Sequence, residues 1–140
     1  MTESSRMTGI VFSDLGRASS FLALDWVQEL LKQRLGYNPF PATLNLRPMG
    51  LEDAELWQRA QQELNGVPLT HATPGYCGAR LFRIEIHGPG QGEGRRVEGA
   101  ILLPEVKDYP KDKIEIVAPM RLKDHFGVED GDALTLEFVN

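Results

Sequence analysis

The chain has 140 residues, of which 41% are hydrophobic and 25% charged, and its formal net charge is −5. This length suffices for one domain with its own hydrophobic core, and the acidic balance argues against a general attraction to nucleic acid or anionic lipid. The single cysteine, Cys77, excludes an internal disulfide, and the sequence contains neither an apolar run of 18 residues nor an apolar leader segment. We therefore expect a monomeric cytoplasmic protein with no nucleic-acid or membrane partner.

The N-terminal part is predicted to hold a tail, a strand and a turn. We expect residues 1–7 to form a flexible tail and residues 8–140 to form a single domain. Residues 9–13 are a short β-type run, and residues 14–20 combine one glycine with small polar side chains, as turns do. Such a turn can offer backbone N–H groups to a phosphate, and a plain connecting loop has the same composition.

Two helical patterns follow, with a strand between them. Apolar residues recur on one helical face from Leu22 onward, and this pattern ends at Gly36 after a basic turn. Residues 51–64 show the second helical pattern. Two prolines between these patterns exclude a helix there, and residues 43–47 alternate between apolar and polar as a strand does.

The second half of the chain is predicted to be mainly β. One or two helical turns are expected near residues 120–126, and residues 88–94 are a glycine-rich loop with no helix after it, which favours a hairpin connection over a phosphate cradle. The expected strands are 79–87, 97–103, 114–118 and 134–139. Six short strands with few helices predict a mainly β fold, a small six-stranded closed barrel with two or three short helices, since closure removes exposed strand edges.

Thr43 and Asn45 are the most informative polar pair. They are two residues apart in an expected strand, so their side chains share one face. A hydroxyl and an amide oxygen side by side are oxygen ligands that Mg²⁺ accepts, and an ordinary polar strand face remains the alternative. The three histidines and Cys77 lack metal-ligand spacing, and no Walker A pattern occurs.

Five segments between residues 8 and 139, taken in order, carry a family resemblance. They are Gly9-Ile-Val-Phe-Ser-Asp-Leu-Gly16, Leu35-Gly-Tyr-Asn-Pro-Phe-Pro-Ala-Thr-Leu-Asn-Leu46, Glu98-Gly-Ala-Ile-Leu-Leu-Pro104, Ile114-Glu-Ile-Val-Ala-Pro-Met-Arg-Leu-Lys123 and Val128-Glu-Asp-Gly-Asp132. Together they resemble the CTP-dependent riboflavin kinases of archaea over roughly residues 8–139.

This resemblance implies a cradle-loop barrel that transfers a phosphate from CTP to the ribityl 5′-hydroxyl of riboflavin, giving FMN and CDP. It implies that Thr43 and Asn45 hold Mg²⁺ and that Lys107 and Glu115 contact the flavin. Glu115, which the strand pattern alone would place on an exposed face, could also serve as the general base. The nucleotide-binding residues implied are Leu15, Gly16, Arg17, Ala18, Ser19 and Ser20 along the phosphates, and Met120, Arg121, Leu122 and Lys123 around the cytidine.

The chain departs from the family pattern at several of these positions. The first loop usually reads Gly-Leu-Gly-Glu-Gly and here runs from Asp14 to Ala18, so it gains Arg17 as a potential phosphate contact. Lys107 stands where a threonine is usual. These changes keep a second hypothesis open, a non-catalytic module that binds flavin or nucleotide. A DNA-binding or assembly barrel is the third, since the Asp-Gly turn before the last strand occurs there too.

Overall fold

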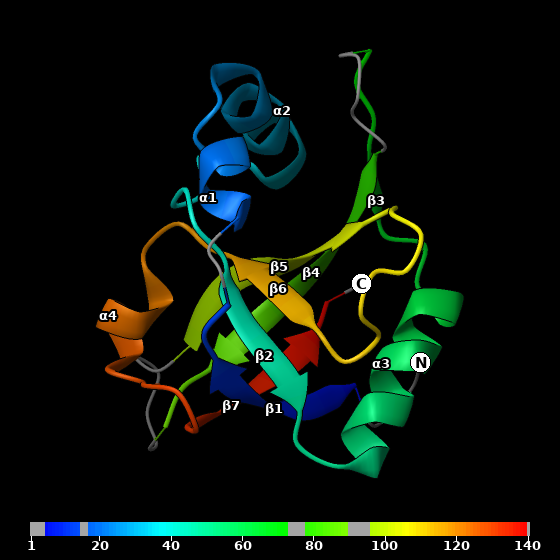
Figure 1. Cartoon of the computed structure of the whole chain (residues 1–140), viewed down its shortest axis with the longest axis vertical. Coiled ribbons are helices and arrows are strands. Elements are labelled where there is room, and N and C mark those ends of the chain that lie inside the picture. Colours follow the sequence, from blue (N-terminus) through cyan, green and yellow to red (C-terminus); the bar gives the residue numbers. More distant parts are fainter. Residues whose placement is uncertain (1–4, 15–16, 73–77, 90–95, 140) are drawn as a thin grey trace.

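The computed structural model describes residues 5–14, 17–72, 78–89 and 96–139, and is mainly β with four short helices in this part of the chain (Figure 1). None of the helices within these residues is long and apolar enough to cross a membrane. The helices are α1 (Arg17–Leu22), α2 (Asp25–Leu35), α3 (Leu51–Glu63) and α4 (Leu122–Phe126). The strands are β1 (Arg6–Phe12), β2 (Leu44–Pro48), β3 (Val67–Leu69), β4 (Ala79–His87), β5 (Arg96–Pro104), β6 (Ile114–Val117) and β7 (Ala133–Phe138).

Six of the strands close into an antiparallel barrel. The strand order is β3-β4-β5-β6-β2-β1-β7, and an additional pairing of β4 with β7 closes the sheet on itself. In that closing pair, Ile84 lies opposite Phe138 and Ile86 opposite Leu136. β3 stays outside the ring and pairs with β4 alone among the described strands. The predicted six-stranded barrel is confirmed, and closure satisfies the edges that an open sheet would expose.

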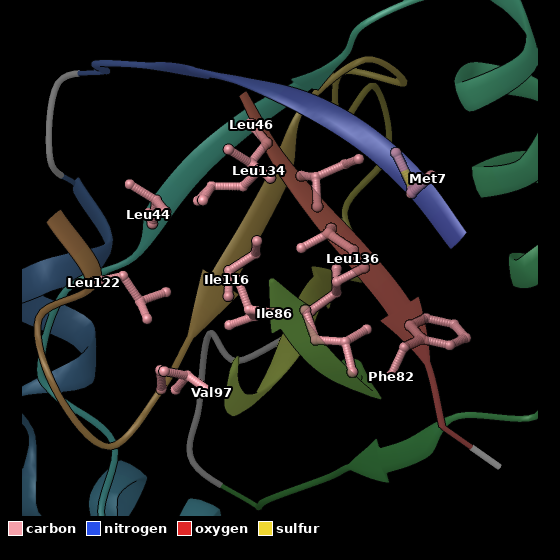
Figure 2. Close-up of a cluster of buried hydrophobic side chains, with 14 of the residues drawn as sticks. Met7, Leu44, Leu46, Phe82, Ile86, Val97, Ile116, Leu122, Leu134 and Leu136 are labelled. Carbon is pink, nitrogen blue, oxygen red and sulfur yellow. The ribbon is translucent and has the colours of Figure 1, made fainter. Parts of the chain in front are cut away.

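The barrel interior is filled by apolar side chains that alternate along the strands. Leu46, Ile86, Ile116 and Leu136 are each at most 1% exposed and point toward one another inside the ring (Figure 2). Trp57 of α3 extends this core beyond the barrel wall: its ring contacts that of Phe82 edge-on, with centroids 5.4 Å apart, in a geometry that aromatic pairs favour.

A second apolar cluster joins α1 and α2 to the outside of the barrel. Leu22, Val27 and Leu31 from the helices pack with Leu81, Leu102 and Val117 from the strands. Figure 1 shows α1 and α2 together at one end of the molecule and α3 at the other. Both faces of β4, β5 and β6 are therefore covered along part of their length, which leaves little room for polar side chains there.

The segment predicted as a turn at residues 14–20 is partly helical, so that prediction is corrected. α1 begins at Arg17, and the Ser19 carbonyl accepts the Ala23 N–H at 3.0 Å. Ala18, Phe21 and Leu22 have helical spacing and pack on the outer cluster, which outweighs the turn propensity of the serines. Leu24 is extended and separates α1 from α2, so the helix expected from Leu22 begins at Asp25.

Three strands also differ from the predictions. β1 begins at Arg6 instead of Gly9, because Arg6 and Met7 pair with β7 and Met7 is buried, so these residues do not belong to a tail. β2 begins one residue after Thr43. β3 was not predicted, since three residues with a central proline are too few to show an alternation.

Candidate active site

A buried carboxylate and a buried amide lie side by side on the barrel wall. Asn45 of β2 and Glu115 of β6 are direct neighbours across the strand pair, and they are 8% and 7% exposed. Among the described residues these are the buried polar or charged side chains. The alternative that Glu115 is an exposed strand residue is therefore wrong. Burying a carboxylate costs free energy unless partners satisfy it, so its contacts identify the groups with which it works.

Glu115 is the centre of a polar cluster drawn from four segments of the chain. Thr43 Oγ1 lies 3.4 Å from Glu115 Oε1 and 3.2 Å from Asn45 Oδ1. The Tyr109 hydroxyl donates to the other carboxylate oxygen, Oε2, at 2.6 Å. Lys113 Nζ is 3.9 Å from Oε1 and forms an ion pair with Asp14. We call this set the Glu115 cluster; its members are Asp14, Thr43, Asn45, Tyr109, Lys113 and Glu115.

Tyr109 is held in its neutral, proton-donating form by this environment. Burial is the largest cause that raises the pKa of its phenol, and the hydrogen bond to Glu115 and the negative charges of Glu115 and Asp14 raise it further. The phenol is therefore protonated throughout the physiological pH range. Oε2 of Glu115 accepts the Tyr109 hydrogen bond, while Oε1 faces Thr43 and Lys113.

The oxygen atoms of Thr43 and Asn45 fit a hard divalent cation. Mg²⁺ binds oxygen at about 2.1 Å in an octahedron, so two ligands on one edge lie about 3.0 Å apart. The Oγ1–Oδ1 separation of 3.2 Å approaches that edge. Thr43 precedes β2, yet its hydroxyl still reaches Asn45. The predicted pair, Thr43 and Asn45, therefore lies together. The Glu115 carboxylate, which the strand pattern alone placed on an exposed face, lies beside this pair.

A cleft of about 120 Å³ opens beside the cluster, with Thr43 in its wall. The segment that precedes and begins α4 forms the facing wall. Four of the predicted nucleotide-binding residues are there, so the structure brings them next to the predicted metal pair. The residues that line the cleft are Phe40, Ala42, Thr43, Leu44, Ile116, Ala118, Met120, Arg121, Leu122 and Lys123.

The two cations of this wall are tied to neighbouring carboxylates. Arg121 contacts Asp124 at 2.6 Å, one turn along the chain. Lys123 Nζ lies 3.5 Å from Asp130 and donates to Ser13 Oγ at 3.3 Å. The Ser13 hydroxyl also donates to Asp130 and is the main cause that lowers the pKa of that carboxyl. Lys123 thereby links α4 to the end of β1, where the first loop starts.

The remaining predicted site residues are less well placed. Leu15 and Gly16 lie outside the described residues, and so does the Arg17 side chain. Lys107 is exposed in the turn between β5 and β6. Of the predicted phosphate loop, Ala18, Ser19 and Ser20 are in α1, where Ala18 packs against the outer cluster.

Sequence reasoning missed Asp14, Tyr109 and Lys113 as members of the cluster. A signal for Lys113 was present: it lies two residues before Glu115, and alternate residues of an extended segment share one face. Tyr109 and Asp14 approach Glu115 from loops, and only the fold brings these loops together. Asp14 gives no periodic signal at all.

A separate group of titratable side chains lies on the pairing of β4 with β7. His87 Nε2 is 3.1 Å from Glu85 and 3.3 Å from Glu137. Arg96 and Arg6 balance these carboxylates at 3.6 and 3.3 Å. These ion pairs lie where β4 and β7 close the barrel. The group shares no residue with the Glu115 cluster or the cleft.

The fold and the site define a class of small β-barrel with a cluster of polar side chains on the wall between β2 and β6. Comparison with known proteins then gives the family. The chain belongs to the family described as "Domain of unknown function DUF120", whose sequence model is named for CTP-dependent riboflavin kinase and matches residues 11–138. The family resemblance read from the five sequence segments is thus confirmed.

Several curated relatives carry the name riboflavin kinase. That of Pyrobaculum aerophilum is 34% identical over 138 residues, which are 96% of this chain and 60% of that protein. The Archaeoglobus fulgidus protein is 30% identical over 138 residues, or 96% of this chain and 54% of that protein. The Aeropyrum pernix protein is 34% identical over 137 residues, or 94% of both chains. This chain thus spans little more than half the length of several relatives and nearly all of another.

Proposed function

We propose that the protein is a CTP-dependent riboflavin kinase, which transfers the γ-phosphate of CTP to the ribityl 5′-hydroxyl of riboflavin and releases FMN and CDP. The observation that carries this proposal is the Glu115 cluster, a buried carboxylate with hydroxyl and amide oxygens at the edge of a cleft. Family membership and the names of the relatives support it. The barrel domain would be the catalytic one, acting as a cytoplasmic monomer on small-molecule ligands.

Phosphoryl transfer needs positioning and charge stabilisation more than covalent chemistry from the protein. Mg²⁺, held by Thr43 and Asn45, would supply charge neutralisation at the phosphates. The cleft between Thr43 and the start of α4 would receive the nucleotide, with residues 120–123 against the cytidine. The Leu15–Ser20 segment would lie along the phosphates, with Arg17 as a side-chain contact.

Glu115 would act on the acceptor. The ribityl hydroxyl oxygen forms a bond to the γ-phosphorus while the bond from that phosphorus to the β–γ bridging oxygen breaks. The hydroxyl proton passes to Glu115 Oε1, and the electron pair of the broken bond stays with CDP. Lys113 Nζ, 3.9 Å from Oε1, places a positive charge beside this reaction path. Lys107, on the loop before β6, would contact the flavin.

Turnover tests the proposal directly. The purified protein is incubated with riboflavin, Mg²⁺ and either CTP or ATP, and FMN and CDP are separated by chromatography. We expect stoichiometric FMN and CDP with CTP and much less FMN with ATP. CTP should also raise the melting temperature more than ATP does, since a ligand that binds the native state stabilises it according to its occupancy. Equal turnover with both nucleotides would refute the donor assignment.

A non-catalytic flavin- or nucleotide-binding module is the second candidate. The ion pair between Lys113 and Asp14 favours this module, because it neutralises a lysine whose charge a kinase would use to bind phosphate. Tight binding of FMN or CDP without any FMN formation would establish this alternative. A DNA-binding barrel has no comparable support, and a salt-dependent shift with generic duplex DNA would be needed to revive it.

A further inference from the structure

The loop between β5 and β6, residues 105–113, covers Glu115 with a defined conformation. Two tight turns build it: the Tyr109 N–H donates to the Val106 carbonyl and the Lys113 N–H to the Pro110 carbonyl, both at 3.3 Å. Asp108 has a φ of 67°, and among the described residues it is the non-glycine residue with positive φ. Aspartate tolerates this left-handed region better than most residues. The backbone thus turns sharply just before Tyr109.

This conformation delivers the Tyr109 hydroxyl to one particular atom. The hydroxyl is 2.6 Å from Glu115 Oε2, the short distance expected when a hydroxyl donates to an ionised carboxylate. The other oxygen, Oε1, faces Thr43 Oγ1 at 3.4 Å and Lys113 Nζ at 3.9 Å. The ammonium group of Lys113 also lies 5.8 Å from the Tyr109 ring centroid, so the ring is anchored from a second side.

We propose that Tyr109 is a positioning residue for the acceptor alcohol: it fixes the rotation of the Glu115 carboxylate so that Oε1 receives the hydroxyl that attacks the phosphate. This inference rests on the proposed kinase function and adds a residue to it. Tyr109 on Oε2 makes the shortest of the carboxylate's contacts, and the longer contacts of Thr43 and Lys113 with Oε1 leave the carboxylate more freedom to turn when that hydrogen bond is lost. Misplacement by about 1 Å can lower a rate about 100-fold.

The alternative is that Tyr109 only packs the loop. Tyr109→Phe separates the two roles because it keeps the ring and removes one oxygen atom. Tyr37→Phe is the matched control: Tyr37 is also half-buried, and its buried hydroxyl has no hydrogen-bond partner within the described part of the chain. Both variants lose one tyrosine hydroxyl, but only Tyr109→Phe loses the contact with Glu115.

The experiment measures FMN and CDP formation by the parent protein and both variants at varied riboflavin and CTP, together with CDP affinity and melting temperature. For Tyr109→Phe we expect kcat to fall about 10- to 100-fold, as loss of a hydrogen bond to a charged group implies. CDP affinity should stay within about twofold, and Tyr37→Phe should match the parent. The ratio of CDP to FMN formed should rise above one, since a misplaced acceptor lets water take the phosphate.

A double-mutant comparison shows whether Tyr109 acts through Glu115. Glu115→Gln alone and together with Tyr109→Phe should have nearly the same kcat, because once the carboxylate is gone its positioning no longer matters. Additive losses, or a Tyr109→Phe kcat within about twofold of the parent, would overturn the inference. If Tyr109→Phe lowered CDP affinity and melting temperature along with kcat, the inference would also be overturned, and Tyr109 would only pack the loop. A parent protein that forms no FMN would instead refute the proposed function, and the inference with it.

Discussion

Alkaline unfolding offers a measurement of how firmly the fold holds Tyr109 and Tyr37 in their protonated state. Burial is the largest cause that raises the pKa of both phenols, that of Tyr37 from 10.0 to about 12, with Glu98 adding to the effect there and Glu115 at Tyr109. The unfolded chain loses these protons near pH 10, whereas the folded chain keeps them. The folded state thus binds more protons above pH 10, and the stability contributed by each phenol, fully present below pH 10, is lost as the pH rises.

The size of this effect follows from the number of protons retained. One retained proton gives a slope of about 1.4 kcal/mol per pH unit. Both rings are partly exposed, and solvent screening reduces the difference, so we expect about 1 kcal/mol per phenol between pH 10 and pH 11. Replacing Tyr109 or Tyr37 by phenylalanine should make the alkaline loss of stability smaller by that amount, while lysine titration is common to all variants.

The assay is urea unfolding followed by tryptophan fluorescence at pH 8, 9, 10 and 11 for the parent, Tyr37→Phe and Tyr109→Phe. The free energy of unfolding at each pH comes from linear extrapolation. If the parent and both variants lose stability with the same slope above pH 10, then the phenols titrate normally in the folded protein. The Tyr109–Glu115 contact would then not hold the proton as described.

Three further predictions concern the ligands and the packing of α2. Thr43→Ala combined with Asn45→Ala should abolish Mg²⁺-dependent FMN formation while the circular dichroism spectrum stays that of the parent; unchanged turnover would remove the metal site. Arg17→Ala should weaken CTP binding about 10- to 150-fold at fixed ionic strength, as expected for a lost charge-assisted phosphate contact, with riboflavin binding nearly unchanged; equally tight CTP binding would make Arg17 a solvated loop residue. Arg83→Ala should lower the free energy of unfolding by about 1 kcal/mol, because Arg83 donates to the Arg34 carbonyl at 2.6 Å near the C-terminal end of α2; a melting temperature identical to that of the parent would contradict this.

The strands that face both core and surface were the most predictable part of the fold. β4 was predicted with its observed ends, since residues 82–87 alternate and glycines stand just outside both ends of the strand. Arg83 shows what the pattern leaves out: its role depends on α2, which is far away in sequence.

The candidate site was predictable only where the chain itself brings the groups together. Thr43 and Asn45 are two residues apart, so local geometry suffices to pair their side chains. Glu115 reaches them through the pairing of β2 with β6, and its contact with Tyr109 depends on a loop that turns at Asp108 and that only the fold places beside it. The first loop was misjudged for a related reason: packing on the outer cluster decides that residues 17–22 are helical, and local propensity does not reveal that packing.

The position of β7 in the barrel has a consequence for how the molecule folds. β7 pairs with β1 on one side and with β4 on the other, and the Arg6–Glu137 contact joins positions 131 residues apart. Neither pairing joins strands that are neighbours in sequence. The chain must therefore lose loop-closure entropy before the closing contacts form. We therefore expect folding on the millisecond-to-second scale that high contact order imposes, with closure by β7 as a late event. Until then the open edges of β1 and β4 are available to another chain, which makes the half-closed barrel the species most prone to aggregate or to exchange its last strand.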